Sequence, residues 1–176
     1  MAETKIKYAA TAAITVTAWD SLGTGAYAVS AQVDNTSNLY MDVLVGGVLA
    51  TDNTLFPDAD DTFDLYVVAT YSDTDTDVTS ALDATGAIGT TSEVLTEGIA
   101  GEFIKENMIF LGSVSMSDTD MAAAEFVHFG PFSIAEVFGG IMPRKWAIVL
   151  HNTCAVGVLE TTGTTLDYTG ITFTSL

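Results

Sequence analysis

Histidine and cysteine are the side chains here best suited to acid–base and nucleophilic chemistry, and the sequence contains two histidines and one cysteine. His151 and Cys154 lie three residues apart, so a base and a nucleophile are close in sequence. On a β-strand, an odd spacing sends two side chains to opposite faces, although across a turn they could still approach. We therefore interpret Cys154 as a small buried side chain and His151 as incidental.

The second histidine, His128, lies between Phe126-Val127 and Phe129. Two histidines cannot form a histidine-rich metal site, and a single histidine on a strand is more often structural than a ligand. We predict a structural role for His128.

The acidic loops are better candidates for a cation, because hard cations prefer oxygen ligands. Asp73, Asp75 and Asp77 match the first three ligand positions of an EF-hand loop, but Val78 replaces its glycine and Ala84 its final glutamate, so the motif fails. A second acidic cluster could hold a cation adventitiously. For both clusters we favour a solvated loop; the second consists of Asp58, Asp60, Asp61 and Asp64.

Familiar catalytic motifs are missing from the sequence. It has no Gly-x-Ser-x-Gly elbow, no phosphate-binding glycine loop and no His-Glu-x-x-His pair. We predict no catalytic residues, no cofactor and no metal ligands, so the protein is expected not to be an enzyme. A hydrolase built on two of the 23 acidic residues stays a third hypothesis.

Charge and composition restrict the partners. The 176 residues carry 23 acidic and five basic side chains, a net charge of −18, while 48% of residues are hydrophobic. Nucleic acids and anionic membranes are bound mainly through lysine and arginine, so we expect neither as a partner. The longest apolar run, 43–50, is too short to span a membrane, and one cysteine cannot form an internal disulfide.

The elements that must position these residues are mostly strands, because apolar side chains alternate with a period of two. We predict one all-β domain over 1–176, an antiparallel sandwich of about nine strands with a jelly roll as one form of it, and a long acidic loop region at about 72–105. The expected strands are 14–18, 27–33, 39–45, 63–71, 108–116, 125–132, 145–152, 156–160 and 164–174.

Two local signals complete this prediction. The polar stretch Asn35-Thr36-Ser37-Asn38 separates two alternating runs and predicts a β-hairpin. Ser133 and Glu136 fit a capping box, and Gly139-Gly140 provides a stop, which together predict one short helix. Asn35-Thr36 and Asn152-Thr153 follow apolar strands in the same way, which we interpret as two similar exits from a strand.

Aromatic residues flank the predicted helix. Phe129-Gly130-Pro131-Phe132 and Pro143-Arg144-Lys145-Trp146 either form an interface or cap the core, and we favour the core. Arg144-Lys145 is a basic pair in an acidic chain, so it could meet an acidic loop of a neighbouring subunit.

Six segments carry a resemblance to a known class of proteins: 19–23, 33–42, 129–133, 138–149, 152–153 and 166–171. These segments resemble small β-rich structural proteins in the virions of tailed bacteriophages. This resemblance implies a decoration (cement) protein on the outer surface of the capsid that stabilises the shell, made in the host cytoplasm, with the major capsid protein and further copies of itself as partners. The alternative is a receptor- or glycan-binding module of a tail fibre or capsid surface, with Tyr66, Tyr71 or the loop around Asp73 lining an aromatic groove.

Overall fold

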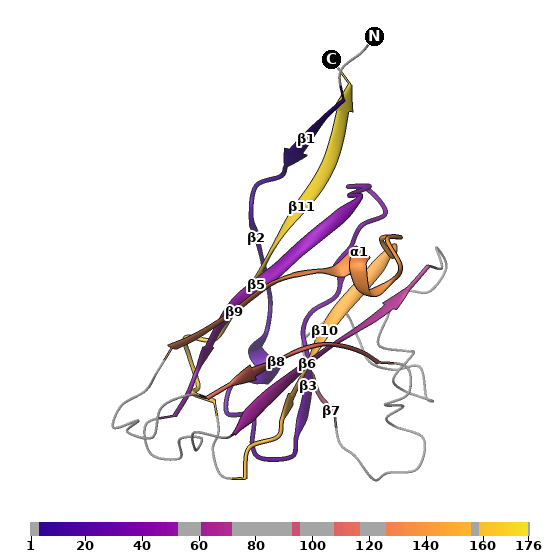
Figure 1. Ribbon diagram of the computed structural model, residues 1–176. Helices are drawn as coiled ribbons and strands as arrows, with labels where there is room; N and C mark the ends of the chain where they lie inside the picture. Colours follow the sequence, from indigo (N-terminus) through magenta and orange to yellow (C-terminus); the bar gives the residue numbers. More distant parts are fainter. Residues whose placement is uncertain are drawn as a thin grey trace.

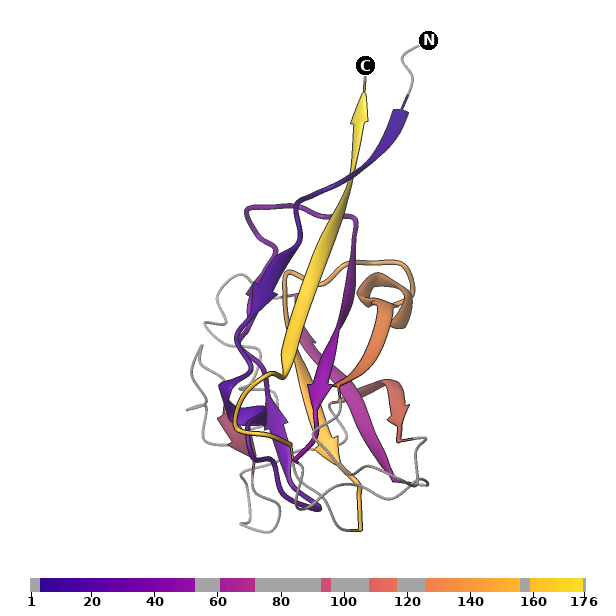
Figure 2. The same cartoon turned by 90° about the vertical axis from the view of Figure 1, so that its left-hand side faces the viewer.

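A computed structural model shows two antiparallel β-sheets that pack face to face (Figures 1 and 2). No helix in the described part of the chain is long and apolar enough to cross a membrane. The structure describes residues 4–52, 61–71, 93–95, 108–116, 126–155 and 159–175.

Sheet A has the order β1–β11–β5–β9, and β2 also pairs with β11. Sheet B has the order β7–β3–β10–β6–β8, and β4 also pairs with β10. The strands of sheet A are β1 (Thr4–Tyr8), β2 (Ala12–Ile14), β5 (Asp42–Ala50), β9 (Phe126–Ser133) and β11 (Thr165–Ser175); those of sheet B are β3 (Tyr27–Val29), β4 (Val33–Asp34), β6 (Thr62–Thr70), β7 (Glu93–Leu95), β8 (Ile109–Ser115) and β10 (Lys145–Asn152).

The predicted β-sandwich is confirmed, and its strand order is that of a jelly roll. The eight strands concerned are β2, β3, β5, β6, β8, β9, β10 and β11. Numbered one to eight along the chain, they lie side by side as 1-8-3-6 in sheet A and as 2-7-4-5 in sheet B. The first and last of these strands are therefore neighbours.

Alternating side chains from both sheets form the core between them. In β6, Phe63, Leu65 and Val67 point inward and are fully buried. Trp146 from β10 and Leu49 from β5 meet them, so the period of two correctly identified the buried faces.

A second apolar cluster lies on the opposite face of sheet B. Val149 and Ala147 of β10 and Val68 of β6 point away from the main core, and all three are buried together with Tyr27 and Val29. The central strand β10 therefore buries apolar side chains on both of its faces.

Some predicted strands are wrong in extent or number. The described residues form eleven strands, and β1 and β7 were not predicted. The strand predicted at 14–18 is not formed. The observed strand β2 ends at Ile14, and a 3-10 helix, η1 (Thr17–Trp19), follows it and buries Trp19. Of the strand predicted at 156–160, Leu159 forms an isolated bridge with Thr51, and 156–158 lie outside the described residues. The acidic loop region predicted at about 72–105 also lies outside them, apart from β7.

The predicted hairpin around Asn35 is also wrong. β4 pairs with β10 in sheet B, whereas β5 pairs with β11 and β9 in sheet A, so this turn crosses between the sheets. The buried Asn35 side chain donates to the Tyr40 carbonyl at 3.2 Å and accepts from the Tyr40 amide at 2.9 Å. These bonds, with Leu39 in a left-handed conformation at φ 52°, redirect the chain.

The predicted helix is confirmed as α1 (Ile134–Val137), a single turn. The Ser133 hydroxyl accepts from the Glu136 amide at 3.0 Å, as the capping signal predicted. Asp42 adds what the signal did not show: its carboxylate accepts from the Ser133 hydroxyl at 2.8 Å and the Ala135 amide at 2.9 Å, which ties α1 to β5.

Close backbone packing at Gly47 gives a testable prediction. A Cβ atom there would overlap the Thr165 carbonyl oxygen of the neighbouring strand and lie 3.0 Å from the Phe129 ring. We expect Gly47→Ala to lower the free energy of unfolding by about 1–3 kcal/mol or more, measured by urea denaturation. Gly23→Ala is the matched control, because nothing lies within 4 Å of a Cβ at that position. Equal effects of the two substitutions would contradict the prediction.

Candidate functional site

The cysteine is buried, as predicted, and unsuited to nucleophilic chemistry. The Cys154 thiol donates to the Thr62 carbonyl at 3.5 Å, and its backbone amide donates to Asn152 Oδ1 at 3.0 Å. Burial, with a smaller contribution from the negative charge of Asp61, raises the pKa of Cys154 to about 12. The thiol therefore stays protonated at neutral pH.

His151 contacts a tyrosine and lies in a polar row that the sequence did not reveal. Its ring stacks on Tyr27, with centroids 3.8 Å apart and planes 5° apart. In register across sheet B, His151 lies opposite Asp64, and Asp64 accepts a 2.5 Å hydrogen bond from Ser113. The order serine–aspartate–histidine puts the carboxylate between the other two, so the serine is not bonded to a base as a catalytic triad requires.

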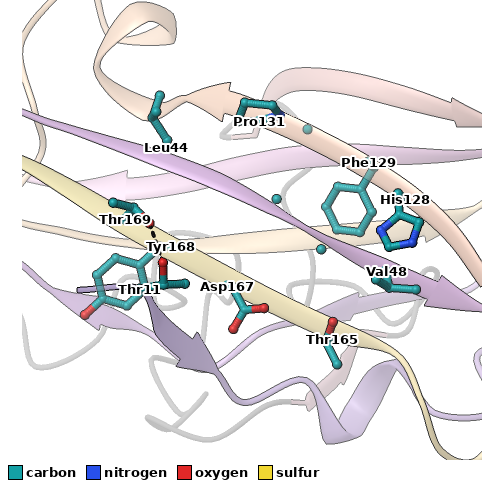
Figure 3. A pocket seen from close by; sticks show the side chains of 13 residues that line it. Thr11, Leu44, Val48, His128, Phe129, Pro131, Thr165, Asp167, Tyr168 and Thr169 are labelled. Carbon is teal, nitrogen blue, oxygen red and sulfur yellow. Dashed lines mark hydrogen bonds between the residues drawn. The ribbon is translucent and has the colours of Figure 1, made fainter. Parts of the chain in front are cut away.

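His128 is exposed and lines a hollow on the outer face of sheet A (Figure 3). The hollow is open, with a volume of about 550 Å³. Asp167 and the Thr11 and Thr169 hydroxyls, which are 2.9 Å apart, lie along it.

Glycines form the floor of this hollow. A Cβ atom at Gly46 would lie 2.9 Å from the Phe129 carbonyl oxygen, and Gly130 has φ +82° with no room for a side chain beside Val45. The hollow therefore results from β5 and β9, which approach each other too closely at these glycines to leave room for side chains. The side-chain hydrogen-bonding groups that line the hollow are hydroxyls, a carboxylate and an imidazole.

Of the acidic clusters, only part lies in the described residues. Asp61 accepts from the Ala155 amide at 3.0 Å and Asp64 from the Ser113 hydroxyl, so both have structural roles. Where the structure describes the chain, no three His, Cys, Asp or Glu side chains are grouped to hold a metal ion. The remaining aspartates lie outside the described residues: Asp58, Asp60, Asp73, Asp75 and Asp77.

The aromatic segments beside α1 belong to the core, as favoured. Phe129 and Trp146 are buried, and Phe132 packs against the same cluster.

Lys145 is buried in register with Asp34. Hydrogen bonds from the Thr36 hydroxyl and amide, assisted by the Lys145 charge, lower the pKa of Asp34.

Exposed apolar side chains gather instead at the end of the sandwich where β5 begins. There a groove of about 340 Å³ separates the loop 35–41 from the segment 142–144. Leu39 is 72% exposed and Ile141 65% exposed, and Met41 and Tyr71 are also largely exposed. We call these four residues, with the groove, the apical surface.

Hydrogen bonds hold both sides of the apical surface in place. The Asn35 amide donates to the Arg144 carbonyl at 2.7 Å, which joins the two loops across the groove. The Tyr71 hydroxyl donates to the Ile141 carbonyl at 3.2 Å, and its ring packs edge-on against Phe138. The apolar side chains therefore project from a preorganised backbone.

The two tyrosines proposed for a glycan groove lie in different places. Tyr66 packs edge-on against Phe110 on the outer face of sheet B, 5.6 Å between centroids, and Tyr71 belongs to the apical surface. The structure does not bring them together into one groove. Asp73, the third member of that hypothesis, lies outside the described residues.

Comparison with known proteins gives no family for this chain. No protein-family model matches it, and no curated protein matches its sequence.

The environment of Cys154 predicts a slow thiol. In the folded protein at pH 8, we expect iodoacetamide to leave Cys154 unmodified, because the raised pKa suppresses the thiolate and burial blocks access. In concentrated urea, where the pKa returns to its ordinary value, the same reagent should modify it fully, as mass spectrometry would show. Equal rates in both states would contradict the buried, protonated thiol.

Proposed function

We propose that this protein is a non-enzymatic structural component of a phage virion, a decoration protein that binds the outer surface of the capsid and stabilises the shell. The observation that carries the proposal is the apical surface, where apolar side chains project from hydrogen-bonded loops. Clustered exposed apolar side chains mark sites of protein association. The proposed partner is the major capsid protein, as the resemblance to virion proteins implies.

The scaffold suits this role. Decoration adds contact area to a shell, which requires a surface whose shape persists before binding. The bonds Asn35–Arg144 and Tyr71–Ile141 hold the apical loops, and Asp42 fixes α1 beside them. The net charge of −18 makes the bodies of free copies repel one another, which favours their solubility before they meet the shell.

Reconstitution on shells lacking this protein tests the proposal. We expect the purified protein to co-sediment with such shells and to raise the temperature at which filled particles release DNA. Replacing Leu39 and Ile141 together by serine should weaken binding about tenfold or more, because it removes apolar contacts from the interface.

Phe126→Ser is the matched control. Phe126 is 62% exposed, comparable with Leu39 and Ile141, but it begins β9 at the end of sheet A farthest from the apical surface. The control should bind like the unaltered protein. Unchanged heat stability of particles without the protein would overturn the stabilising role, and equal loss in both variants would overturn the assignment of the apical surface.

A glycan-binding module is the second candidate, and the hollow on sheet A is the observation that favours it. Hydroxyls of Thr11 and Thr169, the Asp167 carboxylate and the His128 imidazole offer polar groups to a sugar along an open depression (Figure 3). An exposed aromatic ring, which commonly stacks on a sugar, is missing from the described lining: the Tyr168 ring packs edge-on against the buried Trp146.

A glycan array tests this second candidate. If a sugar binds in the hollow, Asp167→Asn should weaken binding about tenfold or more, because a hydrogen bond to a charged group is lost. Glu136→Gln, an exposed carboxylate on α1, is the control and should leave binding unchanged. The absence of any binding sugar, or equal effects of both substitutions, would reject this function.

A further inference from the structure

Part of sheet A projects beyond the body of the sandwich as a two-stranded ribbon (Figures 1 and 2). β5 ends its pairing with β11 where Asp42 meets Ile171, and β11 continues from there beside β1 alone. The pairs run from Tyr8 opposite Ile171 to Thr4 opposite Ser175. We call Thr4–Tyr8 with residues 171–175 the ribbon.

The apolar face of β11 changes sides where the ribbon begins. Within the body, Leu166 and Gly170 are buried and the Tyr168 ring packs against the core, so the even-numbered positions face inward. In the part of β11 that belongs to the ribbon, the large apolar residues are the odd-numbered Ile171 and Phe173. Odd positions in the body are polar, as Thr165, Asp167 and Thr169 show, so a second apolar face begins on the opposite side of the same strand.

The register of β1 completes this face. Ile6 lies opposite Phe173 and Tyr8 opposite Ile171, and residues paired in this way project to the same side. Lys5 and Lys7 alternate with them and therefore share the other side with Thr172 and Thr174. The ribbon is thus amphipathic.

This apolar face is open to solvent. Ile6 is 61%, Tyr8 60% and Phe173 54% exposed. Two strands alone are only marginally stable in water, and apolar faces of sheets are normally covered. A strand that places its apolar residues on the uncovered side is suited to contact with another surface.

We propose that the ribbon is a self-association element, in which the apolar face of one copy packs against the same face of a second copy of this chain. The charge distribution allows this occupant, because the ribbon lies outside the acidic body. The described ribbon residues include two of the five basic side chains and no acidic one, so 23 acidic and three basic residues remain in the rest of the chain. Two bodies of such charge repel one another, and the projecting ribbon allows contact while keeping them apart.

Faces, rather than strand edges, make the contact. If β1 paired edge to edge with β1 of a second copy, Lys5 and Lys7 of both copies would share one face, and like charges across strands are destabilising. Packing of the apolar faces leaves all these lysines in solvent. In a two-fold contact, Tyr8 of one copy can meet Phe173 of the other, and the reverse contact follows by symmetry.

The size of the face sets the strength of association. Aromatic side chains bury about 150–250 Å² each, so the four rings of two copies bring about 600–1,000 Å² together, and the isoleucines of the face add a smaller area. Stable interfaces bury about 1,200–2,000 Å² in total. We therefore expect association that depends on concentration and falls apart on dilution.

Sedimentation equilibrium of the full chain tests the proposal. The protein should form dimers as its concentration rises, and Ile6→Ser with Phe173→Ser should shift the dissociation constant upward tenfold or more. Lys5→Ser with Thr174→Ser is the matched control, because this pair is the adjacent register pair on the other face. A protein that stays monomeric at all concentrations, or equal effects of both double variants, would overturn the proposal.

Cross-linking gives a second readout that does not depend on removing apolar residues. The one natural cysteine, Cys154, is buried, so a cysteine introduced on the ribbon supplies the accessible thiol. Ile6→Cys should form disulfide-linked dimers under mild oxidation, whereas Lys5→Cys should form few. Cross-linking that is equal at both positions would contradict a contact through one face.

Salt dependence separates this contact from an electrostatic one. Screening weakens repulsion between the acidic bodies, so raising the ionic strength should strengthen association through the apolar face. If the ribbon lysines instead held the acidic surface of the partner, the same salt would dissociate it, and that outcome would overturn the proposal. These measurements need no capsid, so their result is independent of the proposed function.

Discussion

The sandwich depends on the burial of β10 on both of its faces. Trp146, Ile148 and Leu150 fill the core between the sheets, while Ala147 and Val149 join the second cluster on the outer side of sheet B. A strand without a solvent-facing side must pair on both edges, because its backbone polar groups cannot reach water. β3 and β4 pair with one edge and β6 with the other, so most of sheet B is organised around this strand.

Hydrogen bonds of buried polar groups connect both ends of β10 to the neighbouring loops. At its end, the Asn152 side chain donates to the Leu22 carbonyl at 2.9 Å and accepts from the Cys154 amide. Just before the first residue of β10, the Arg144 carbonyl accepts a hydrogen bond from the Asn35 backbone amide. The Asn35 side chain in turn forms hydrogen bonds with the backbone of Tyr40. The apical surface and the strand order are thus linked through bonds that would each be costly to leave unmade in the interior.

How much of this could be read from the sequence differs between elements. Alternation identified β6 because its period follows directly from burial, and the capping signal of α1 is local to Ser133 and Glu136. The turn at Asn35 was misread because a polar turn looks the same whether it joins neighbours or crosses between sheets. The pairing of β1 with β11 joins opposite ends of the chain, which no local pattern encodes. The hollow beside His128 arises from backbone contacts at Gly46 and Gly130, whereas the change of face after Gly170 was visible in the alternation itself.

The pairing of Thr4 with Ser175 has a mechanical consequence. In this antiparallel pair, a force that pulls Thr4 and Ser175 apart loads the hydrogen bonds between the strands one after another. Such a ribbon yields at low force from its tip, while the body, with β11 held between β2 and β5, is loaded only after the ribbon has opened. Such a force would therefore separate β1 from β11 before it disturbed the sandwich, so opening of the ribbon would delay mechanical unfolding of the core.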